Sequence, residues 1–558
     1  MNKYILASAL VAFTMTSCSD FLDVQPEGAP TTTNFFTNDQ QAIDAIDYVY
    51  EEMPVEDMFG RHIFYEQAAA NDIVWGRTRS FNTLATFKYT GDESPLNDTF
   101  KRFYQQMARC NYIIHGLLKK GENNLTPIET RTLGEAYFNR AFSHFWIAHR
   151  YGTDKLGCPF VRWEDYLPNE YDNAIPAQQE SVMVNYQYII DDLDNAMKYL
   201  PKFEEYTAAD QGRAHQAAAL GYKAKTYAYW ATWDASKWDD VIACVNQLEN
   251  QYGRGLADSY EDIFGWDYAK WWNREYIWSF PSDAAPNGAR FGGCKLPGVM
   301  LKNHSWWRWN GETWVGGYNG WGYIKPTNDI YEEFLKDGDR EHNPRLAYSM
   351  LSYGDVFPFF GVEDAFYDDS DLAAGFMVYK YQHQYGPADC METGVACNNG
   401  DNGMVRINFP MLRMAEMLLF RAEANLAKGN AGEAANDLNK IRQRSNLAPI
   451  QGAATWADLY HERRCELAFE YSNHLFDLKR WNRSSNSEIK AIADAELNAR
   501  PTVRVHEDRT DPYSGYTVEF YEDYADKAPY QPYMMTFPYP SAQIINSNGA
   551  LKNIPEYQ

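Results

Sequence analysis

Hydrophobic residues recur at spacings of three and four from about residue 38 to residue 253, which predicts paired amphipathic helices. One stripe lies between residues 182 and 200, and a second, rich in alanine, lies between residues 217 and 231. A polar stretch from Pro201 to Arg213 separates them, so we expect an antiparallel pair joined by a loop. The stripes are Val182, Tyr186, Ile189, Leu193, Ala196 and Leu200, and Ala217, Leu220, Ala224, Ala228 and Ala231.

An earlier helical pair is predicted over residues 100–119 and 129–150. The second helix of this pair is hydrophobic on two faces, so it must be covered on both sides. Stacked helical hairpins have this property and resemble tetratricopeptide repeats, although residues 151–180 interrupt the period. The predicted fold is therefore mainly α, a tetratricopeptide-like scaffold of helical hairpins. The two faces are Leu133, Tyr137, Ala141 and Phe145, and Phe138, Phe142 and Trp146.

Helices return in the last third of the chain. A hydrophobic stripe from Leu412 to Leu426 stops at Gly429, and Asn430 with Glu433 predicts a capped start for the next helix. Another helix is expected from Thr455 through Glu470. The tail from residue 500 is polar and rich in proline, and we expect it to be extended.

Between about residues 256 and 403 the helical period fades, and glycine, proline, tryptophan, tyrosine and aspartate dominate. This composition predicts a large irregular region of loops and short strands. Within it, residues 304–323 read HSWWRWNGETWVGGYNGWGY and hold five of the seventeen tryptophans. Neither a helical nor a strand period fits this aromatic stretch, and its glycines favour turns, so a loop is expected to present the rings.

Large flat apolar faces beside hydrogen-bonding groups suit sugars, which carry both C–H faces and hydroxyls. The alternative is that these rings cap an underlying core, since tryptophan is highly buried on average. We expect two or three of the tryptophans to line a ligand site. The candidate residues in this stretch are Trp306, Trp307, Trp309, Trp314, Tyr318 and Trp321.

The net charge of the chain limits the classes of ligand and partner that it can bind. The 558 residues include 51 Lys and Arg against 76 Asp and Glu, for a net charge of −25. Such a chain disfavours nucleic acid, anionic lipid surfaces and polyanionic glycans, and a neutral ligand fits better.

The N-terminus, MNKYILASALVAFTMTSCSDFLD, has the pattern of a bacterial lipoprotein signal. A basic residue precedes a short apolar run, and small residues lead to Cys18. Removal of residues 1–17 and acylation of Cys18 are expected, so that a lipid anchor holds the protein to a membrane. An ordinary secretory signal with an incidental cysteine is the alternative. No later run of 18 apolar residues is present.

Metal, cofactor and catalytic motifs are weak. The seven remaining cysteines are scattered and include no CxxC pair, which argues against zinc, although Cys390 and Cys397 could close a small loop. No cofactor is expected. The acidic run at residues 363–371 and the segment 398–403 could hold a structural calcium ion, but solvated turns fit them better. His461-Glu462 lacks the HExxH spacing, so metal-hydrolase chemistry is unsupported.

Three separated segments carry a family pattern. They are CSDFLDVQPEG with TTTNFFTNDQQA near the start, GEAYFNRAFSHFWIAHRYG in the middle, and a C-terminal set. The C-terminal set comprises FPMLRMAEMLLFRAEANLAKGNAGEAANDLNKIRQRS, then ERRCELAFEYSNHLFDLKRWNR, the most specific part, then FPYPSAQIINSNGALKNI. These segments resemble the SusD/RagB family, the surface glycan-binding lipoproteins of Bacteroidetes.

The resemblance implies four tetratricopeptide-like units whose loops form a ligand site on one face. It also implies a partner, a TonB-dependent outer-membrane transporter of the SusC type, and exposure at the cell surface, with Asp20 and Asp23 resembling the export signal. The segment EQAAANDIVWGRTRS resembles a second ligand segment of the family. It adds four candidate ligand residues, Asn71, Asp72, Trp75 and Arg77.

The sequence therefore predicts a non-enzymatic lipoprotein of the outer membrane, facing the exterior, that captures neutral oligosaccharides and hands them to a transporter. A secreted glycoside hydrolase remains an alternative, because enzyme subsites also carry aromatic platforms and the chain has ample carboxylates. A SusD-like binder of a non-glycan nutrient is another. The predicted regions are a signal peptide (1–17), a tether (18–37), a helical region (38–255), a loop-rich variable region (256–405) and a C-terminal helical region with its tail (406–558).

Overall fold

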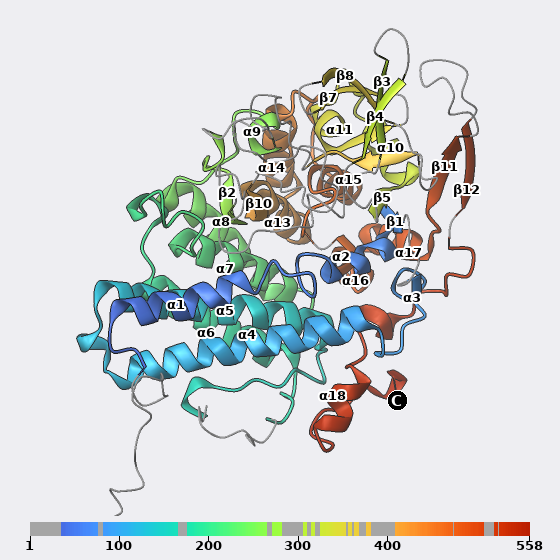
Figure 1. Ribbon diagram of the computed structural model, residues 1–558. Helices are drawn as coiled ribbons and strands as arrows, with labels where there is room; N and C mark the ends of the chain where they lie inside the picture. The colour runs from blue at the N-terminus through green and yellow to red at the C-terminus, as the bar shows by residue number, and fades with distance from the viewer. Residues whose placement is uncertain are drawn as a thin grey trace, which may run out of the picture.

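The structure, a computed structural model, is mainly helical (Figure 1). The structure describes only the backbone of Trp75 and of the strand residues 305–309, 314–318, 356–359, 362–367, 504–506 and 518–522. The described residues are 35–75, 82–165, 176–264, 270–281, 305–309, 314–318, 324–352, 355–359, 362–367, 375–380, 408–472, 474–506, 518–522 and 524–557.

The predicted N-terminal helical pairs are confirmed. Helix α5 is the centre of this half: every residue from Thr132 to Tyr151 is buried, so the helix is covered on both sides as its two hydrophobic faces require. It begins with a capping box between Thr126 and Glu129, which satisfies two otherwise free backbone N–H groups. The helices of this half are α1 (Asp39–Glu51), α4 (Ser94–Lys119), α5 (Pro127–Tyr151), α6 (Val182–Tyr199), α7 (Gln216–Trp230) and α8 (Trp238–Tyr252).

Small residues on α7 permit close approach, as the alanine stripe predicts. A Cβ atom added at Gly221 would lie 2.7 Å from a methyl carbon of Leu412 and 2.8 Å from Ile277. Those two residues belong to the paired strands β10 (Phe409–Arg413) and β2 (Tyr276–Phe280). The N-terminal helices are thereby packed directly against the strand that leads into the C-terminal half.

The C-terminal helices also form, with three differences from the prediction. Leu412 belongs to strand β10 instead of the first helix turn, and α15 ends at Glu466, four residues before Glu470. Asn430 occupies the position before α14, but its side chain makes no capping hydrogen bond, so the predicted cap is wrong. The helices are α13 (Met414–Ala427), α14 (Ala431–Arg444), α15 (Trp456–Glu466), α16 (His474–Asn482) and α17 (Ser487–Asn498).

The tail is not simply extended. It contains the antiparallel strands β11 (Thr502–His506) and β12 (Val518–Glu522) and the short helix α18 (Ser541–Asn546). The remaining short helices of the described chain are α2 (His62–Tyr65), α3 (Asn82–Ala85), α9 (Glu261–Phe264), α10 (Asn328–Leu335) and α11 (Pro344–Ser349). Its 3₁₀ turns are Glu66–Ala70, Glu122–Asn124, Trp163–Asp165, Phe203–Glu205, Ala235–Lys237, Pro532–Met535 and Pro555–Tyr557.

Short antiparallel strands accompany the helices. β1 (Ile73–Trp75) pairs with β5 (Ile324–Pro326), and β6 (Met350–Ser352) pairs with β9 (Phe376–Val378). A four-stranded sheet has the order β4-β3-β8-β7 and lies at the top of the view in Figure 1. Its strands are β3 (Ser305–Trp309), β4 (Trp314–Tyr318), β7 (Val356–Phe359) and β8 (Val362–Tyr367). Within the described residues, no helix has the length and apolar character needed to cross a membrane.

Candidate functional site

Two candidate ligand segments that lie about 250 residues apart in sequence meet in one backbone ladder. Trp75 in β1 is the register partner of Ile324 in β5. Ile324 directly follows the aromatic stretch, which ends at Tyr323. The ladder therefore joins the segment around residue 75 to the C-terminal end of the tryptophan-rich segment.

Asn71 forms the turn that leads into β1. It adopts a left-handed conformation with φ of 62°, which asparagine tolerates better than most residues. Its side chain is fully buried: the Nδ2 group donates to the backbone oxygen of Glu496 at 2.5 Å, and Lys527 Nζ donates to Oδ1 at 3.2 Å. The hydroxyl of Thr327 donates to the backbone oxygen of Asn71 at 2.6 Å. These contacts give Asn71 a structural task, and its predicted contact with a ligand stays a prediction.

Asp72 is also buried and paired. Its carboxylate accepts a 2.7 Å hydrogen bond from Nε of Arg464 on α15 and lies 3.7 Å from Nε2 of His474. Its backbone oxygen accepts from the backbone N–H of Thr327 at 3.1 Å, beside the β1–β5 ladder. A carboxylate held by a buried arginine fixes the start of the strand, so Asp72 positions the segment that carries Trp75.

The aromatic stretch is partly a β-hairpin, and the prediction that a loop presents it is wrong for these residues. Strands β3 and β4 pair so that Trp309 lies opposite Trp314 and Ser305 opposite Tyr318. Trp306 and Trp307 lie opposite Gly317 and Gly316, so glycines that suggested a loop occupy ladder positions across from bulky residues. Strand β8, about 60 residues later, pairs with the other edge of β3: Trp306 pairs with Tyr367 and Trp307 with Phe366.

Several predicted residues fall outside the described part of the chain. They are Trp321 and Arg77 of the ligand set, the lipidation residue Cys18, the pair Cys390 and Cys397, and the segment 398–403. Of the acidic run, Glu363 and Asp364 lie in strand β8, not in a turn. Four other cysteines, Cys110, Cys158, Cys244 and Cys465, are free and buried, where a thiol packs as a small hydrophobic side chain.

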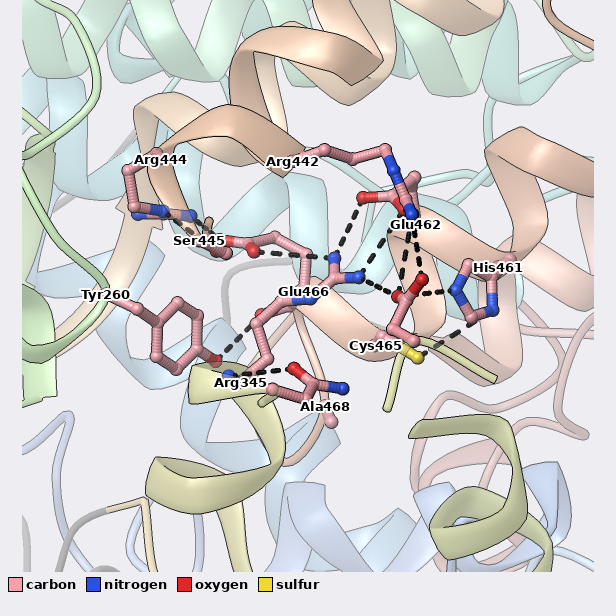
Figure 2. A network of polar contacts seen from close by, with 12 residues as sticks. Tyr260, Arg345, Arg442, Arg444, Ser445, His461, Glu462, Cys465, Glu466 and Ala468 are labelled. Atoms are coloured by element: carbon pink, nitrogen blue, oxygen red, sulfur yellow. Dashed lines mark hydrogen bonds and ion pairs between the residues drawn. The ribbon is translucent and has the colours of Figure 1, made fainter. Parts of the chain in front are cut away.

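Glu462 and Glu466, in the most specific segment of the family resemblance, lie in a buried network of ion pairs with arginines (Figure 2). Arg413 donates to Glu275 at 2.8 Å and to Glu466 at 2.6 Å, and Arg444 donates to Glu275 at 2.8 Å. Burial alone would raise the pKa of Glu466, but three neighbouring guanidinium groups lower it to about 2. Carboxylates held so firmly ionised are suited to fixing helices, not to donating a proton.

His461 is bound on both sides. Nδ1 lies 2.6 Å from a Glu333 oxygen and Nε2 lies 2.8 Å from an Asp337 oxygen. Burial opposes protonation, but the Cys465 sulfur and these carboxylates raise the pKa of His461 to about 12. The ring is therefore an imidazolium and has no lone pair for a metal ion.

Two groups of described residues bring three metal-ligand atoms within 4.8 Å of one another. One is Asp337, His461 and Glu462, where Arg345 and Arg442 already neutralise the carboxylates. The other is Asp57, His62 and Asp98, where Arg102 donates to Asp57 at 3.1 Å. Arginines of the chain thus already neutralise the carboxylates of the first group and Asp57 of the second.

Sequence reasoning missed the residues that hold the site in place. Lys527 donates to the backbone oxygens of Ala69 and Ala499 at 3.2 and 2.8 Å as well as to Asn71. Burial lowers the pKa of Lys527 to about 8. No local pattern marks Lys527 or Glu496, because both act on a turn more than 400 residues away in sequence.

Two family models match the chain. The model described as "SusD family" matches residues 274–557, and the model described as "Starch-binding associating with outer membrane" matches residues 20–228. Among curated proteins, no sequence matched.

Solved structures share the fold. Surface glycan-binding protein A from Bacteroides uniformis has a TM-score of 0.67 at 20% identity, with 93% of this chain and 100% of that chain covered. A structure described with xylogluco-oligosaccharide has a TM-score of 0.68 at 20% identity, covering 92% and 99%. A laminarin-binding SusD-like protein has a TM-score of 0.65 at 19% identity, covering 93% and 98%.

Proposed function

This chain belongs to the SusD family, and from that membership we propose that it captures neutral oligosaccharides at the cell surface without altering them. The family model for starch-binding proteins associating with the outer membrane supports this location. So do two structural neighbours, one described with xylogluco-oligosaccharide and one as laminarin binding. The net charge of −25 favours a neutral ligand over a polyanion.

The β1–β5 ladder is the observation that carries the proposal. It joins Trp75 to the end of the aromatic stretch, while Trp307, Trp309 and Trp314 occupy a hairpin earlier in that stretch. We propose that ligand stacks on rings from both segments. Asn71 and Asp72 then act mainly by holding β1 through Glu496, Lys527 and Arg464.

Binding of this kind is expected to be weak. Each aromatic contact contributes roughly 0.5–1.5 kcal/mol beyond area burial if sugars behave like ring partners. Two or three such contacts with a few hydrogen bonds correspond to micromolar to millimolar dissociation constants, because association has its own entropic cost. Weak capture suits a protein that releases its cargo to a transporter.

Delivery to a TonB-dependent transporter of the SusC type completes the proposal, with anchoring through acylated Cys18. Acyl chains at Cys18 would hold the protein at the outer membrane, and an outward orientation would place the hairpin where it meets extracellular glycans. Membrane contact is then made by the anchor alone.

The ligand site is tested by Trp307→Ala and Trp309→Ala. Titration calorimetry with an oligosaccharide selected on a glycan array should show weaker binding for these variants. Their unfolding midpoints should match that of the parent. Trp163→Ala, a partly buried tryptophan elsewhere on the scaffold, is the control and should bind normally. Unchanged affinity in all single variants of the five aromatic-stretch tryptophans would refute this site.

The non-enzymatic role has a separate test. The purified protein should release no reducing sugar from any glycan that it binds. Release that persists after repurification would replace the binding role with glycoside hydrolysis.

A further inference from the structure

A large pocket opens in the helical scaffold, apart from the ladder and the hairpin. Its volume is about 660 Å³, within the usual range of small-molecule sites. Its walls come from the C-terminal ends of α7, α13 and α16 and from the first residues of α8 and α15. None of its lining residues belongs to the β1–β5 ladder or to the β3–β4 hairpin.

The charge of this pocket is opposite to that of the chain as a whole. Its lining holds three cations, Arg480, Arg483 and Lys428, against one carboxylate, Glu423. Both carboxylate oxygens of Glu423 already accept hydrogen bonds, one from Arg480 at 2.6 Å and the other from the Trp481 indole at 2.8 Å. Arg480 is also paired with Asp477, so it offers no free charge, and the positive charge that can reach a ligand comes from Arg483 and Lys428.

Among the described residues, Lys428 is held only by an exposed ion pair. It forms a 2.6 Å ion pair with Asp239, whose side chain is 71% exposed. Surface pairs of this kind contribute little, so Lys428 can turn toward a bound anion at small cost.

Arg483 is the cation best placed to receive an anion. Its guanidinium stacks over the indole of Trp233, 4.3 Å from the ring centroid. Arg483 is exposed, and no ion pair joins it to a carboxylate among the described residues. A guanidinium placed over a ring leaves its edge N–H groups available, which favours two parallel hydrogen bonds to a carboxylate.

The remaining polar lining fits hydroxyl groups. Thr232, Ser484 and Ser485 contribute hydroxyls, and Asn486 contributes an amide whose oxygen caps α17 by accepting from Glu488 and Ile489. The Asn486 amide nitrogen is the part not used in that cap. One carboxylate site surrounded by hydroxyl and amide groups is the complement of a sugar acid.

We propose that this pocket binds a single hexuronate, with its carboxylate on Arg483 and its hydroxyls on the serines, Thr232 and Asn486. This goes beyond the capture of neutral oligosaccharides and does not depend on the hairpin. The net charge of −25 restricts the ligand to one carboxylate, because a polyanion would be repelled by the rest of the chain.

The test compares sugars that differ only at C6: glucuronate with glucose, and galacturonate with galactose. Calorimetry on the mature chain at fixed ionic strength should show binding of at least one hexuronate, tenfold or more tighter than its neutral counterpart. Arg483→Gln should reduce that binding at least tenfold. Ser485→Trp, which fills the pocket from an exposed turn, should do the same. Lys490→Gln removes an exposed cation outside the pocket and should change nothing.

Three results would overturn the proposal: no hexuronate binding, equal binding of acid and neutral sugar, or full binding by Arg483→Gln. Trp307→Ala with Trp309→Ala separates the two sites. If this double variant loses hexuronate binding while Arg483→Gln keeps it, the hairpin is the only sugar site. If the double variant loses neutral oligosaccharide alone, both sites stand.

Discussion

The sequence alone could not decide between two roles for Asn71: contact with a ligand, or support of the strand that carries Trp75. The structure supports the second role through side-chain hydrogen bonds to the backbone oxygen and carboxylate of Glu496 and from the ammonium of Lys527. A neutral hydrogen bond contributes about 0.5–1.5 kcal/mol, and one to a charged group contributes about 1.5–3 kcal/mol. Asn71→Gly should therefore lower the free energy of unfolding by about 2–4 kcal/mol.

Asn71→Ala should lower the free energy of unfolding by roughly 1 kcal/mol more than Asn71→Gly, because the left-handed conformation is strained for alanine and not for glycine. Asn446 is the matched control: it has a similar φ of 55°, is exposed, and its side chain makes no hydrogen bond to another described residue. Asn446→Ala should show only the conformational loss of about 1 kcal/mol. Asn446→Gly measures the effect of glycine on the unfolded chain.

Urea unfolding measures these differences, provided that the dependence of the unfolding free energy on urea concentration is unchanged. Calorimetry far below the unfolding temperature measures oligosaccharide affinity. Asn71→Gly should change affinity by less than about tenfold, or 1.4 kcal/mol. Wild-type stability combined with a larger loss of affinity would refute the structural role and restore Asn71 as a ligand contact.

Two further predictions concern the ion network and the anchor. Glu466→Gln should destabilise the protein by about 3–5 kcal/mol, because it leaves buried arginines unpaired, while Glu433→Gln on the exposed face of α14 should have little effect. The folded pKa of Glu466 is about 2, below its ordinary value of 4.5, so its contribution to the free energy of unfolding is present above pH 4.5 and lost as pH falls toward 2. Equal acid sensitivity of the parent and Glu466→Gln in unfolding titrations would contradict this. Cys18→Ala should give a soluble, unanchored form in membrane fractionation, and persistent membrane association would count against acylation at this residue.

The helical scaffold could be predicted because its signal is local. The stripes at 182–200 and 217–231 and the two-faced helix at 129–150 follow from hydrophobic spacing, and each became a buried helix face. The cap expected at Asn430 failed, because a cap depends on the exact backbone angles before the helix, which residue type alone does not set.

The candidate site was harder to predict because its contacts are long-range. Trp75 and the aromatic stretch could be identified as candidates from composition and family resemblance. Their connection through Ile324 could not, since strand pairing between distant segments leaves no period in either one. The same holds for the hairpin, whose third strand β8 lies about 60 residues away.

The sequence by itself determined the mainly helical scaffold, the family and the aromatic segment, because these depend on residue type and local spacing. Tertiary structure alone decided that Asn71 and Asp72 are buried anchors, that Glu462 and Glu466 belong to a buried ion network, and that Arg483 stands over Trp233 at a pocket. The physical reason is that burial and charge pairing are properties of groups brought together from distant parts of the chain. A residue's own neighbours in sequence do not reveal which of those groups will face it.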